Sequence, residues 1–412
     1  MVNGGKRNDQ ALPDGTVLHG RYIVRDILGI GGFGITYAGY DTRDQEACAI
    51  KELFIGDTVT RGRDGKTVAV NAGKERMFSH GIRRFMEEAQ ILNKLNGMEN
   101  VVRITDYFQE NNTAYFVMEY VKGMTLRDFV KKNGGAVPLG EACRIICKTG
   151  KVLDFIHRRY GIFHRDISPE NILIEPDGEP KIIDFGNAKS YMRDVEKNMS
   201  IVLKPGFAPP EQYTGKNQGP WTDVYSLAGV FYFITTGIKV PPATERLAGA
   251  GYTPLSGLVP QCRPEISDAV DRGLSLDIRT RLQSTAELAD ALELYTPADV
   301  LREISESAEP YVALWHGGDL QDVWRLPPDA EMVVGRDPQN SNIVIEGENQ
   351  ISKRHCLVTY DSHMCGFQVT DISTNGIFCG QEKLIKEREY RIEPGEKLRL
   401  GKTGFVIEVG VN

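Results

Sequence analysis

The sequence predicts a multidomain chain in which an α+β region is followed by an all-β sandwich. Three observations support this prediction. The first part combines β-prone runs with long amphipathic stretches such as Arg84–Leu95. Its middle carries the motif-like stretch Phe163–Ile174, and from Tyr311 the sequence changes to short β-prone runs separated by turn residues. A length of 412 residues agrees with two or three domains.

The composition is that of an ordinary soluble globular protein, with 41% hydrophobic and 25% charged residues. A formal net charge of −7 argues against broad binding to nucleic acid or to membrane surfaces. No apolar run is long enough to cross a bilayer, and Met1–Gln10 lacks the apolar core of a signal peptide. The 7 cysteines are scattered and never spaced Cys-x-x-Cys, which fits a reduced, cytoplasmic compartment.

A flexible lead-in is expected for residues 1–19, followed by a strand, a glycine-rich turn and a second strand. The turn contains Gly29, Gly31, Gly32 and Gly34, where backbone without side chains can approach phosphates and offer N–H donors. Alone, the pattern is also that of a flexible hairpin. The same spacing occurs in dinucleotide folds, but there it opens a helix, whereas the residues after Gly34 have the pattern of a strand.

Lys51 ends the next predicted strand. By itself it is an ordinary exposed strand lysine, but after a phosphate-binding loop it becomes a candidate for binding phosphates. An insert lies between Lys51 and the helix predicted over Arg84–Leu95. It has a turn at residues 63–66 between two short β-prone runs, and the sequence does not show its purpose.

The stretch Phe163–Ile174, with the sequence FHRDISPENILI, has a phosphoryl-transfer layout. Asp166 can orient a substrate hydroxyl and accept its proton, while Asn171 and Asp184 can hold Mg²⁺ against phosphates. Each pattern alone arises by chance. Found in this order after the glycine-rich turn and Lys51, the motifs resemble those of the protein-kinase superfamily.

The resemblance implies a bilobal α+β protein-kinase fold over residues 20–295, with a small lobe at about 20–120 and a large lobe at about 121–295. Lys51 would bind the α- and β-phosphates of ATP and pair with Glu88, with Glu87 as the second choice. The segment AYFVMEYVKG would be the hinge beside the adenine, with Met118 as gatekeeper. The residues expected to contact ATP are Gly29, Gly31, Gly32, Gly34, Ala49, Lys51, Glu119, Val121 and Leu173.

Three further residues would have structural roles in such a fold. Glu211, in GFAPPEQY, would pair with Arg281, and Asp223 would brace the catalytic loop.

The activation segment offers Ser200, and less favourably Ser190, as phosphorylation sites. Serine or threonine is the expected acceptor in substrates, although tyrosine stays open.

The chain departs from the family pattern at two positions. Serine/threonine kinases carry a lysine where this chain has Ser168, and a threonine where it has Lys204. Loss of the loop lysine removes positive charge from the transferring γ-phosphoryl group, which should slow catalysis. We hypothesise that Lys204 reaches back toward Asp166 and the γ-phosphate and acts as a catalytic residue. Alternatively, Lys204 is an exposed loop residue of a weak or inactive kinase.

Short motifs lie at loop-like positions within the predicted sandwich, in the order GR, SKRH and STNG. The set resembles the forkhead-associated (FHA) domain, expected over residues 311–412 after a linker at 296–310. The resemblance implies binding of phosphothreonine peptides. The candidate ligands are Arg336 and Ser352 for phosphate oxygens, Thr374 as a further donor and Asn375 for the peptide backbone.

Two residues near these motifs have alternative interpretations. His355 is expected to brace a loop rather than bind the peptide. Thr296, in the sequence TPAD, matches a favoured phosphothreonine ligand, but it also has the pattern of a helix N-cap, which we favour.

We therefore expect an ATP- and Mg²⁺-dependent protein serine/threonine kinase that acts on protein substrates. Its FHA domain would recruit threonine-phosphorylated proteins, and a transient homodimer would allow autophosphorylation in trans. The main alternative is a pseudokinase scaffold whose output is phosphothreonine binding. A small-molecule kinase, such as an aminoglycoside phosphotransferase, is disfavoured by the activation segment and the phosphopeptide module.

Overall fold

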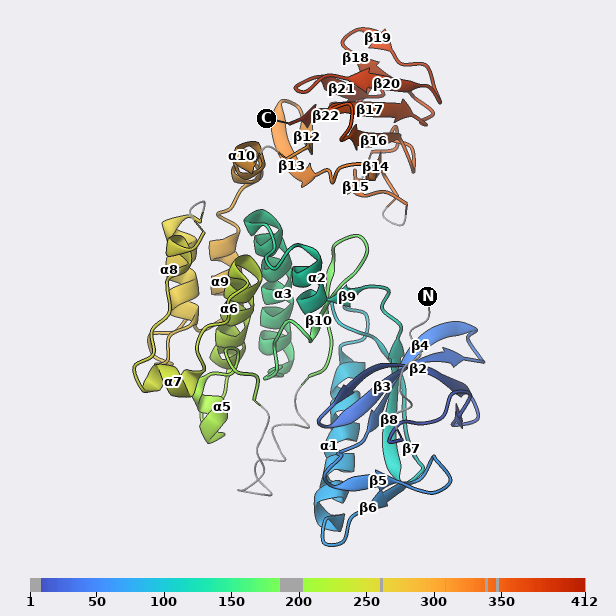
Figure 1. Cartoon of the computed structure of the whole chain (residues 1–412), viewed down its shortest axis with the longest axis vertical. Helices are drawn as coiled ribbons and strands as arrows, with labels where there is room; N and C mark the ends of the chain where they lie inside the picture. The colour runs from blue at the N-terminus through green and yellow to red at the C-terminus, as the bar shows by residue number, and fades with distance from the viewer. Residues whose placement is uncertain are drawn as a thin grey trace. The chain divides into compact units, whose positions relative to one another are not determined.

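The computed structural model describes residues 9–185, 203–259, 262–307, 309–337, 340–345 and 348–411. The chain divides into two compact units. The first consists of Met1–Val137 with Arg144–Leu292, and the second of Pro138–Cys143 with Glu293–Asn412. The strands of the first unit are blue to green in Figure 1, and those of the second are orange to red.

The small lobe of the first unit is built on a six-stranded antiparallel sheet. Its strands run in the order β1 (Val17–Leu18), β2 (Tyr22–Gly31), β3 (Gly34–Asp41), β4 (Glu46–Leu53), β8 (Thr113–Glu119) and β7 (Ile104–Glu110). Helix α1 (Glu75–Lys94) packs on this sheet, with the Phe85 and Phe116 rings 4.8 Å apart. The helix begins before the expected Arg84 because Met77 and Phe78 extend its buried face.

The insert after Lys51 folds into the hairpin of β5 (Val59–Arg61) and β6 (Val68–Val70). The Arg61 guanidinium donates hydrogen bonds of 2.7 Å to both carboxylate oxygens of the fully buried Glu52. It also donates to the backbone carbonyl of Gln10. The insert therefore fastens the N-terminal segment to the sheet.

This fastening differs from the flexible lead-in expected through residue 19. From Asp9 onward the segment is described, Leu12 and Leu18 are buried, and β1 pairs with β2. The amide of Leu12 donates to the Tyr37 hydroxyl at 3.0 Å. Burial of these two leucines stabilises the segment, and the sequence-based expectation did not include this burial.

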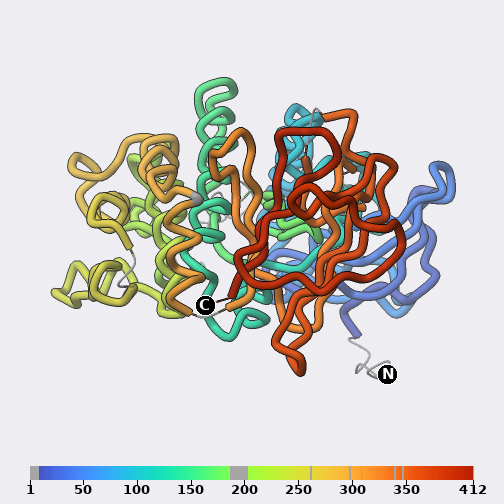
Figure 2. The backbone as a smooth tube through the Cα atoms, turned by 90° about the horizontal axis from the view of Figure 1, so that it is seen from above, coloured from blue at the N-terminus to red at the C-terminus, as the bar shows by residue number. Residues whose placement is uncertain are grey.

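The large lobe is mainly helical, and Figure 2 shows it at the opposite end of the first unit from the blue small-lobe strands. Helix α6 (Pro220–Thr236) is buried along nearly its whole length, as expected of a helix that is apolar all round. The helices are α2 (Leu126–Lys132), α3 (Leu139–Tyr160), α5 (Pro210–Thr214), α6 (Pro220–Thr236), α7 (Ala243–Leu247), the 3₁₀ turn η1 (Leu255–Gly257), α8 (Pro264–Gly273) and α9 (Thr285–Leu292). A small sheet has the order β11 (Pro180–Ile182), β10 (Ile172–Ile174) and β9 (Met124–Thr125).

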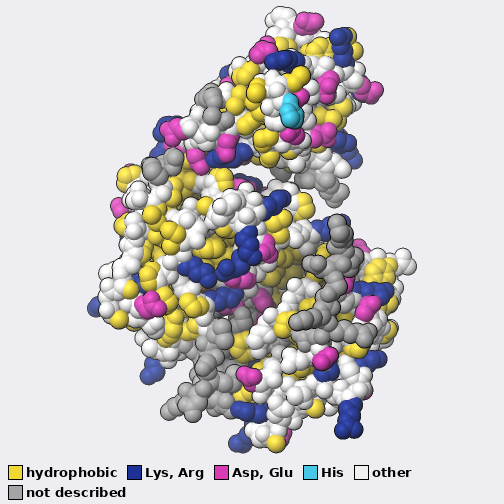
Figure 3. Space-filling model, viewed as in Figure 1, with side chains coloured by type: hydrophobic (Ala, Val, Ile, Leu, Met, Phe, Trp, Pro, Cys, Tyr) yellow, Lys and Arg dark blue, Asp and Glu magenta, His cyan; other side chains and the backbone are white. Residues whose placement is uncertain are grey.

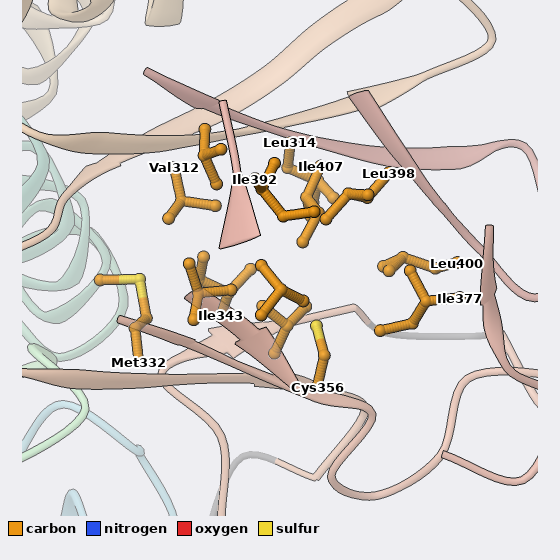
Figure 4. Close-up of a cluster of buried hydrophobic side chains, with 14 of the residues drawn as sticks. Val312, Leu314, Met332, Ile343, Cys356, Ile377, Ile392, Leu398, Leu400 and Ile407 are labelled. Atoms are coloured by element: carbon orange, nitrogen blue, oxygen red, sulfur yellow. The ribbon is translucent and has the colours of Figure 1, made fainter. Parts of the chain in front are cut away.

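The second unit is a sandwich of two sheets. One has the order β13 (Asp319–Arg325), β12 (Tyr311–His316), β22 (Phe405–Gly410), β21 (Lys397–Leu400), β18 (Ile377–Cys379) and β19 (Glu382–Lys383). The other has the order β15 (Ile343–Val344), β14 (Glu331–Gly335), β16 (Cys356–Asp361), β17 (Gly366–Asp371) and β20 (Glu389–Ile392). Aliphatic side chains such as Val312, Ile343 and Ile407 point toward one another from the two sheets and form the core (Figure 4).

Helix α10 (Pro297–Ser307) occupies most of the segment expected to be a linker. Its Ile304 is fully buried in a cluster with Tyr311 and Val323 of the adjoining hairpin. The Arg325 guanidinium also lies 2.9 Å from a carboxylate oxygen of Glu303. The helix therefore belongs to the second unit, because its apolar face packs on the outer side of that hairpin.

Candidate active site and phosphopeptide-binding surface

The Lys51 ammonium meets two carboxylates from separate elements. Lys51 lies on β4, Glu88 on α1, and Asp184 just after β11. The ammonium contacts the Asp184 carboxylate and lies 3.9 Å from the Glu88 carboxylate, whose side chain is 3% exposed. Glu87 instead pairs with Arg84. The structure thus brings Lys51, Glu88 and Asp184 together.

The glycine-rich turn joins β2 to β3 and contains glycines with different surroundings. A side chain at Gly34 would lie 2.3 Å from the carbonyl oxygen of Glu52, so close strand packing requires this glycine. Around Gly29 and Gly32 the space is open, and at Gly31 only the Gly34 carbonyl is near. These three positions can therefore accommodate phosphate groups beside bare backbone.

The predicted adenine-contacting residues lie on neighbouring strands. Ala49 on β4 pairs with Met118 on β8, and Glu119 follows at the end of that strand. The Glu119 carboxylate is occupied by the Lys181 ammonium at 2.9 Å, so only its backbone is offered to a nucleotide. Val121 follows β8, while Leu173 is half-buried on β10 between two buried isoleucines.

The catalytic-loop candidates are tied to each other. The Asn171 amide nitrogen donates to the Asp166 carboxylate at 2.6 Å and to its backbone carbonyl at 2.7 Å. This leaves the amide oxygen of Asn171 available. Amide and carboxylate oxygens, such as those of Asn171 and Asp184, are the hard donors that Mg²⁺ prefers. Among the described residues, no group of three or more His, Cys, Asp or Glu side chains could hold a metal ion. Protein sites for Mg²⁺ commonly use one or two carboxylates together with substrate phosphates and water.

The side chain of Asp223, on α6, holds the backbone of the catalytic loop. Its carboxylate accepts hydrogen bonds of 2.7 Å from the amides of His164 and Arg165, and one of 2.8 Å from His157. Burial acts to raise the pKa of Asp223, but these hydrogen bonds and the nearby histidines outweigh it and lower the pKa. The bracing expected from the sequence is therefore present.

Ile183, Asp184 and Phe185, which precede the activation segment, pack against the catalytic loop. The His164 ring lies 3.0 Å from the Ile183 carbonyl, and the Ile183 amide donates to the Asn171 carbonyl at 3.0 Å. Phe185 is fully buried with its ring centroid 4.5 Å from that of His164. These contacts hold Asp184 close to Lys51. Ser190 and Ser200 lie outside the described residues.

The Lys204 side chain contacts the catalytic loop. Its ammonium donates to the Ser168 hydroxyl at 2.5 Å and lies 3.6 Å from the Asp166 carboxylate. Lys204 is 25% exposed and Ser168 is fully buried. The ammonium is therefore next to the residue that the sequence proposes as the proton acceptor.

The predicted ion pair between Glu211 and Arg281 is present and buried. The Arg281 guanidinium donates to the two carboxylate oxygens of Glu211 at 2.5 and 3.2 Å, with the two side chains at most 3% exposed. The Thr222 hydroxyl adds a hydrogen bond to the same carboxylate. This pair anchors the segment after Lys204 to the large lobe.

The phosphopeptide-binding candidates of the second unit converge from three loops. The Arg336 amide donates to the Ser352 carbonyl, and the Ser352 hydroxyl accepts a 3.0 Å hydrogen bond from the Thr374 amide. The Asn375 side chain donates to the Gln350 carbonyl at 2.7 Å. The side chains of Arg336, Thr374 and Asn375 are exposed, so an anion in solvent can reach them.

His355 braces these loops from the interior, as expected. It is fully buried, accepts from the Ser352 amide through Nδ1, and contacts the Gly376 carbonyl through Nε2 at 3.3 Å. Burial lowers the pKa of His355. At the start of α10, the Asp299 carboxylate accepts hydrogen bonds from the Thr296 amide at 2.9 Å and from the Thr296 hydroxyl at 2.6 Å, which agrees with the interpretation of this segment as a helix start.

Two residues beside Lys204 were not assigned by sequence reasoning. Glu170 lies 3.7 Å from the Lys204 ammonium, and Arg127 on α2 donates to the same glutamate. Glu170 stands inside the recognised motif and could have been suspected from its place between Asp166 and Asn171. Arg127 lies in a stretch without any motif, so only the fold reveals it.

Surface charge on the face shown in Figure 3 is mixed. On the face shown in Figure 3, lysine and arginine side chains are interspersed with aspartate and glutamate over both units. Within the described ranges, none of the helices is long and apolar enough to span a membrane.

Two known protein families match the chain. Residues 22–249 match the protein kinase domain, and residues 332–401 match the FHA domain. The chain belongs to the protein kinase family and carries an FHA domain. A bilobal kinase fold followed by a β sandwich is thereby confirmed.

Curated relatives are bacterial kinases. The chain is 30% identical to Serine/threonine-protein kinase B of Synechocystis over 75% of its own length and 52% of that protein. It is 30% identical to PknA of Mycobacterium tuberculosis over 68% of its length and 62% of that protein. The chain thus spans between about half and two thirds of these relatives.

Solved structures agree with the fold of the first unit. PpkA-294 in its apo form shares 31% identity and a TM-score of 0.63, covering 69% of this chain and all of that one. The kinase domain of Mycobacterium tuberculosis PknI, at 22% identity and a TM-score of 0.52, supports the fold alone.

Proposed function

We propose that the chain transfers the γ-phosphate of ATP to serine or threonine hydroxyls of proteins. The observation that carries this proposal is the meeting of Lys51, Glu88 and Asp184 beside the hydrogen-bonded pair of Asp166 and Asn171. In a member of the protein kinase family, these are the groups that bind phosphates, orient the acceptor and hold the metal. A pseudokinase scaffold is less well supported, because these groups are all present.

The residues divide the chemistry among themselves. Lys51, oriented by Glu88, binds the α- and β-phosphates. Asp166 orients the substrate hydroxyl and accepts its proton, while the hydroxyl oxygen bonds to the γ-phosphorus and the bond to the β–γ bridging oxygen breaks. ADP leaves with that electron pair. Asn171 and Asp184 offer the oxygens for Mg²⁺, which neutralises phosphate charge when bound.

Lys204 takes over the role of the missing loop lysine in this proposal. Support comes from its hydrogen bond to Ser168, the position where the lysine would stand, and from its distance of 3.6 Å to Asp166. A preorganised ammonium at this place stabilises charge that develops on the transferring phosphoryl group.

Transfer of labelled γ-phosphate from Mg·ATP to dephosphorylated casein tests the proposal. The full chain is expected to label casein, and Asp184→Asn, which removes a metal ligand, is expected to label it far more slowly. Label at the same rate in both, or in neither, would contradict phosphoryl transfer by this site. Chelation of Mg²⁺ should abolish the transfer by the wild-type chain.

We further propose that the second unit binds phosphothreonine peptides. The convergence of Arg336, Ser352, Thr374 and Asn375 on one exposed surface supports this role. A guanidinium can grip phosphate oxygens with two donors, and the hydroxyl of Ser352 adds a third. Threonine-phosphorylated proteins are the partners that this chemistry would recruit.

Binding of a phosphothreonine peptide to the full chain, measured by fluorescence anisotropy, tests the second role. The peptide is expected to bind, whereas its unphosphorylated form is not. Arg336→Ala should weaken binding more than tenfold, while Arg354→Ala, which changes an exposed arginine beside Glu331, serves as the matched control. Equal binding of both peptide forms would contradict phosphate recognition.

A further inference from the structure

The ammonium of Lys204 lies among one hydroxyl and two carboxylates. It donates to Ser168 at 2.5 Å, and it lies 3.6 Å from an oxygen of Asp166 and 3.7 Å from Oε2 of Glu170. A lysine on the catalytic loop would be placed by the loop itself. Lys204 arrives from a different segment on a long, rotatable side chain, so something must hold its end in place.

Glu170 is itself held in place. The Arg127 guanidinium donates through Nε to Oε1 of Glu170, and the Arg127 amide donates to the Pro169 carbonyl at 3.1 Å. The same guanidinium carbon lies 5.5 Å from the ring centroid of Phe233 on α6. An arginine fixed at its backbone and against an aromatic ring leaves Glu170 little freedom, so Oε2 is presented to Lys204.

Both carboxylate oxygens of Glu170 have a cationic neighbour. The Lys204 ammonium lies 3.7 Å from Oε2, and the Arg127 guanidinium contacts Oε1. Such a carboxylate is poorly suited to select a basic residue in the substrate, because its charge is already balanced within the chain.

We propose that Glu170 is a positioning residue that, held by Arg127, keeps the Lys204 ammonium beside Ser168 and the γ-phosphoryl site. This inference rests on the proposed function. Of the two carboxylates described beside the Lys204 ammonium, Asp166 would remain if Glu170 were removed. A tight pair with Asp166 would occupy the group that must orient the substrate hydroxyl and accept its proton. Glu170 therefore offsets this pull and leaves Asp166 to the substrate.

The test places Glu170→Gln in two backgrounds of the full chain. One is wild type, and the other is Ser168→Lys with Lys204→Thr, where the lysine is returned to the loop. Phosphoryl transfer to casein is measured over a range of ATP concentrations. In wild type, kcat is expected to fall about tenfold with the KM for ATP nearly unchanged, whereas in the reverted background kcat should change less than twofold.

The outcomes separate the possible roles of Glu170. An equal loss in both backgrounds would overturn the inference and indicate a general structural role. With basic peptides as substrates, a rise in their KM in both backgrounds would overturn the inference and indicate that Glu170 selects the substrate. Glu179→Gln, which removes a carboxylate paired with Lys148 on the same lobe, is the matched control and should leave kcat unchanged. If the wild-type chain itself shows no transfer, the proposed function fails instead.

A second measurement does not depend on turnover. The rate at which acetic anhydride modifies Lys204 can be followed by mass spectrometry, with the exposed Lys132 as internal reference. Glu170→Gln removes one of the groups that hold the end of the Lys204 side chain, so it should accelerate labelling of Lys204 several-fold and leave Lys132 unchanged. Arg127→Met should act in the same direction. Unchanged labelling of Lys204 in Glu170→Gln would overturn the inference.

Discussion

Replacing Lys204 with methionine removes an ammonium and keeps a side chain of similar length. Nζ lies 3.6 Å from the Asp166 carboxylate, so a γ-phosphate oxygen near Asp166 would lie within reach of it. At a separation of about 5 Å and an effective dielectric constant of about 20, two unit charges interact by about 3 kcal/mol. Because part of that interaction already exists with bound ATP, a loss of about 1.5–3 kcal/mol in the transition state is expected, or roughly 10- to 150-fold in kcat.

The assay is steady-state transfer of labelled phosphate to casein, with kcat and the KM for ATP determined separately. The loss should fall mainly on kcat, and adding Ser168→Lys to Lys204→Met should recover part of it. Lys216→Met, which changes an exposed lysine on the loop after α5, is the matched control. A turnover number for Lys204→Met within twofold of wild type would refute the reasoning and return Lys204 to an ordinary loop residue.

Three further predictions concern stability and binding. Arg281→Met should lower the free energy of unfolding of the first unit by about 3–5 kcal/mol, visible as a lower thermal midpoint, because Glu211 keeps a buried charge without its guanidinium. His355 has a lowered pKa in the folded state, so the unfolded chain binds more protons as pH falls below about 6.5. The opening equilibrium of β16, obtained from amide exchange after correction for the intrinsic exchange rate at each pH, should therefore become more favourable from pH 7 to pH 5, and His355→Asn should weaken that dependence. Arg336→Lys should bind a phosphothreonine peptide more weakly than wild type in anisotropy, because an ammonium cannot form the two-pronged contact of a guanidinium.

The arrangement of the kinase site could be predicted because its motifs carry their own spacing. Lys51, Glu88 and Asp184 come from a strand, a helix and a turn that the sequence placed in the right order, and the structure brings them together. The preference for Glu88 over Glu87 rested on the resemblance to protein kinases, in which the corresponding helix carries the ion-pairing glutamate. Glu87 indeed faces outward and pairs with Arg84.

Contacts between distant segments could not be predicted in the same way. Nothing near Arg61 in the sequence indicates that its guanidinium would reach Glu52 and the Gln10 carbonyl. The helical pattern of α10 was visible, but its partner Val323 lies on a hairpin that only the folded sandwich places beside Ile304. Such long-range pairing depends on tertiary packing, which local patterns do not encode.

The link between Lys204 and Ser168 stands between these cases. Two departures from one family pattern, a lysine lost and a lysine gained, predicted that the two positions would meet. The hydrogen bond of 2.5 Å between them agrees with that hypothesis. Glu170 and Arg127 complete the arrangement, but no departure from the pattern marked either of them.

The central claim is that one chain both phosphorylates proteins and binds phosphothreonine. It is tested most directly by following labelled casein after transfer. Wild type, Asp184→Asn and Arg336→Ala are each incubated with Mg·ATP and casein, the labelled residues are mapped, and retention of labelled casein on the immobilised chain is measured. We predict label on threonine in wild type, its retention by wild type, normal labelling with reduced retention in Arg336→Ala, and little label in Asp184→Asn. Labelling by Asp184→Asn at the wild-type rate, or equal retention by wild type and Arg336→Ala, would contradict the account.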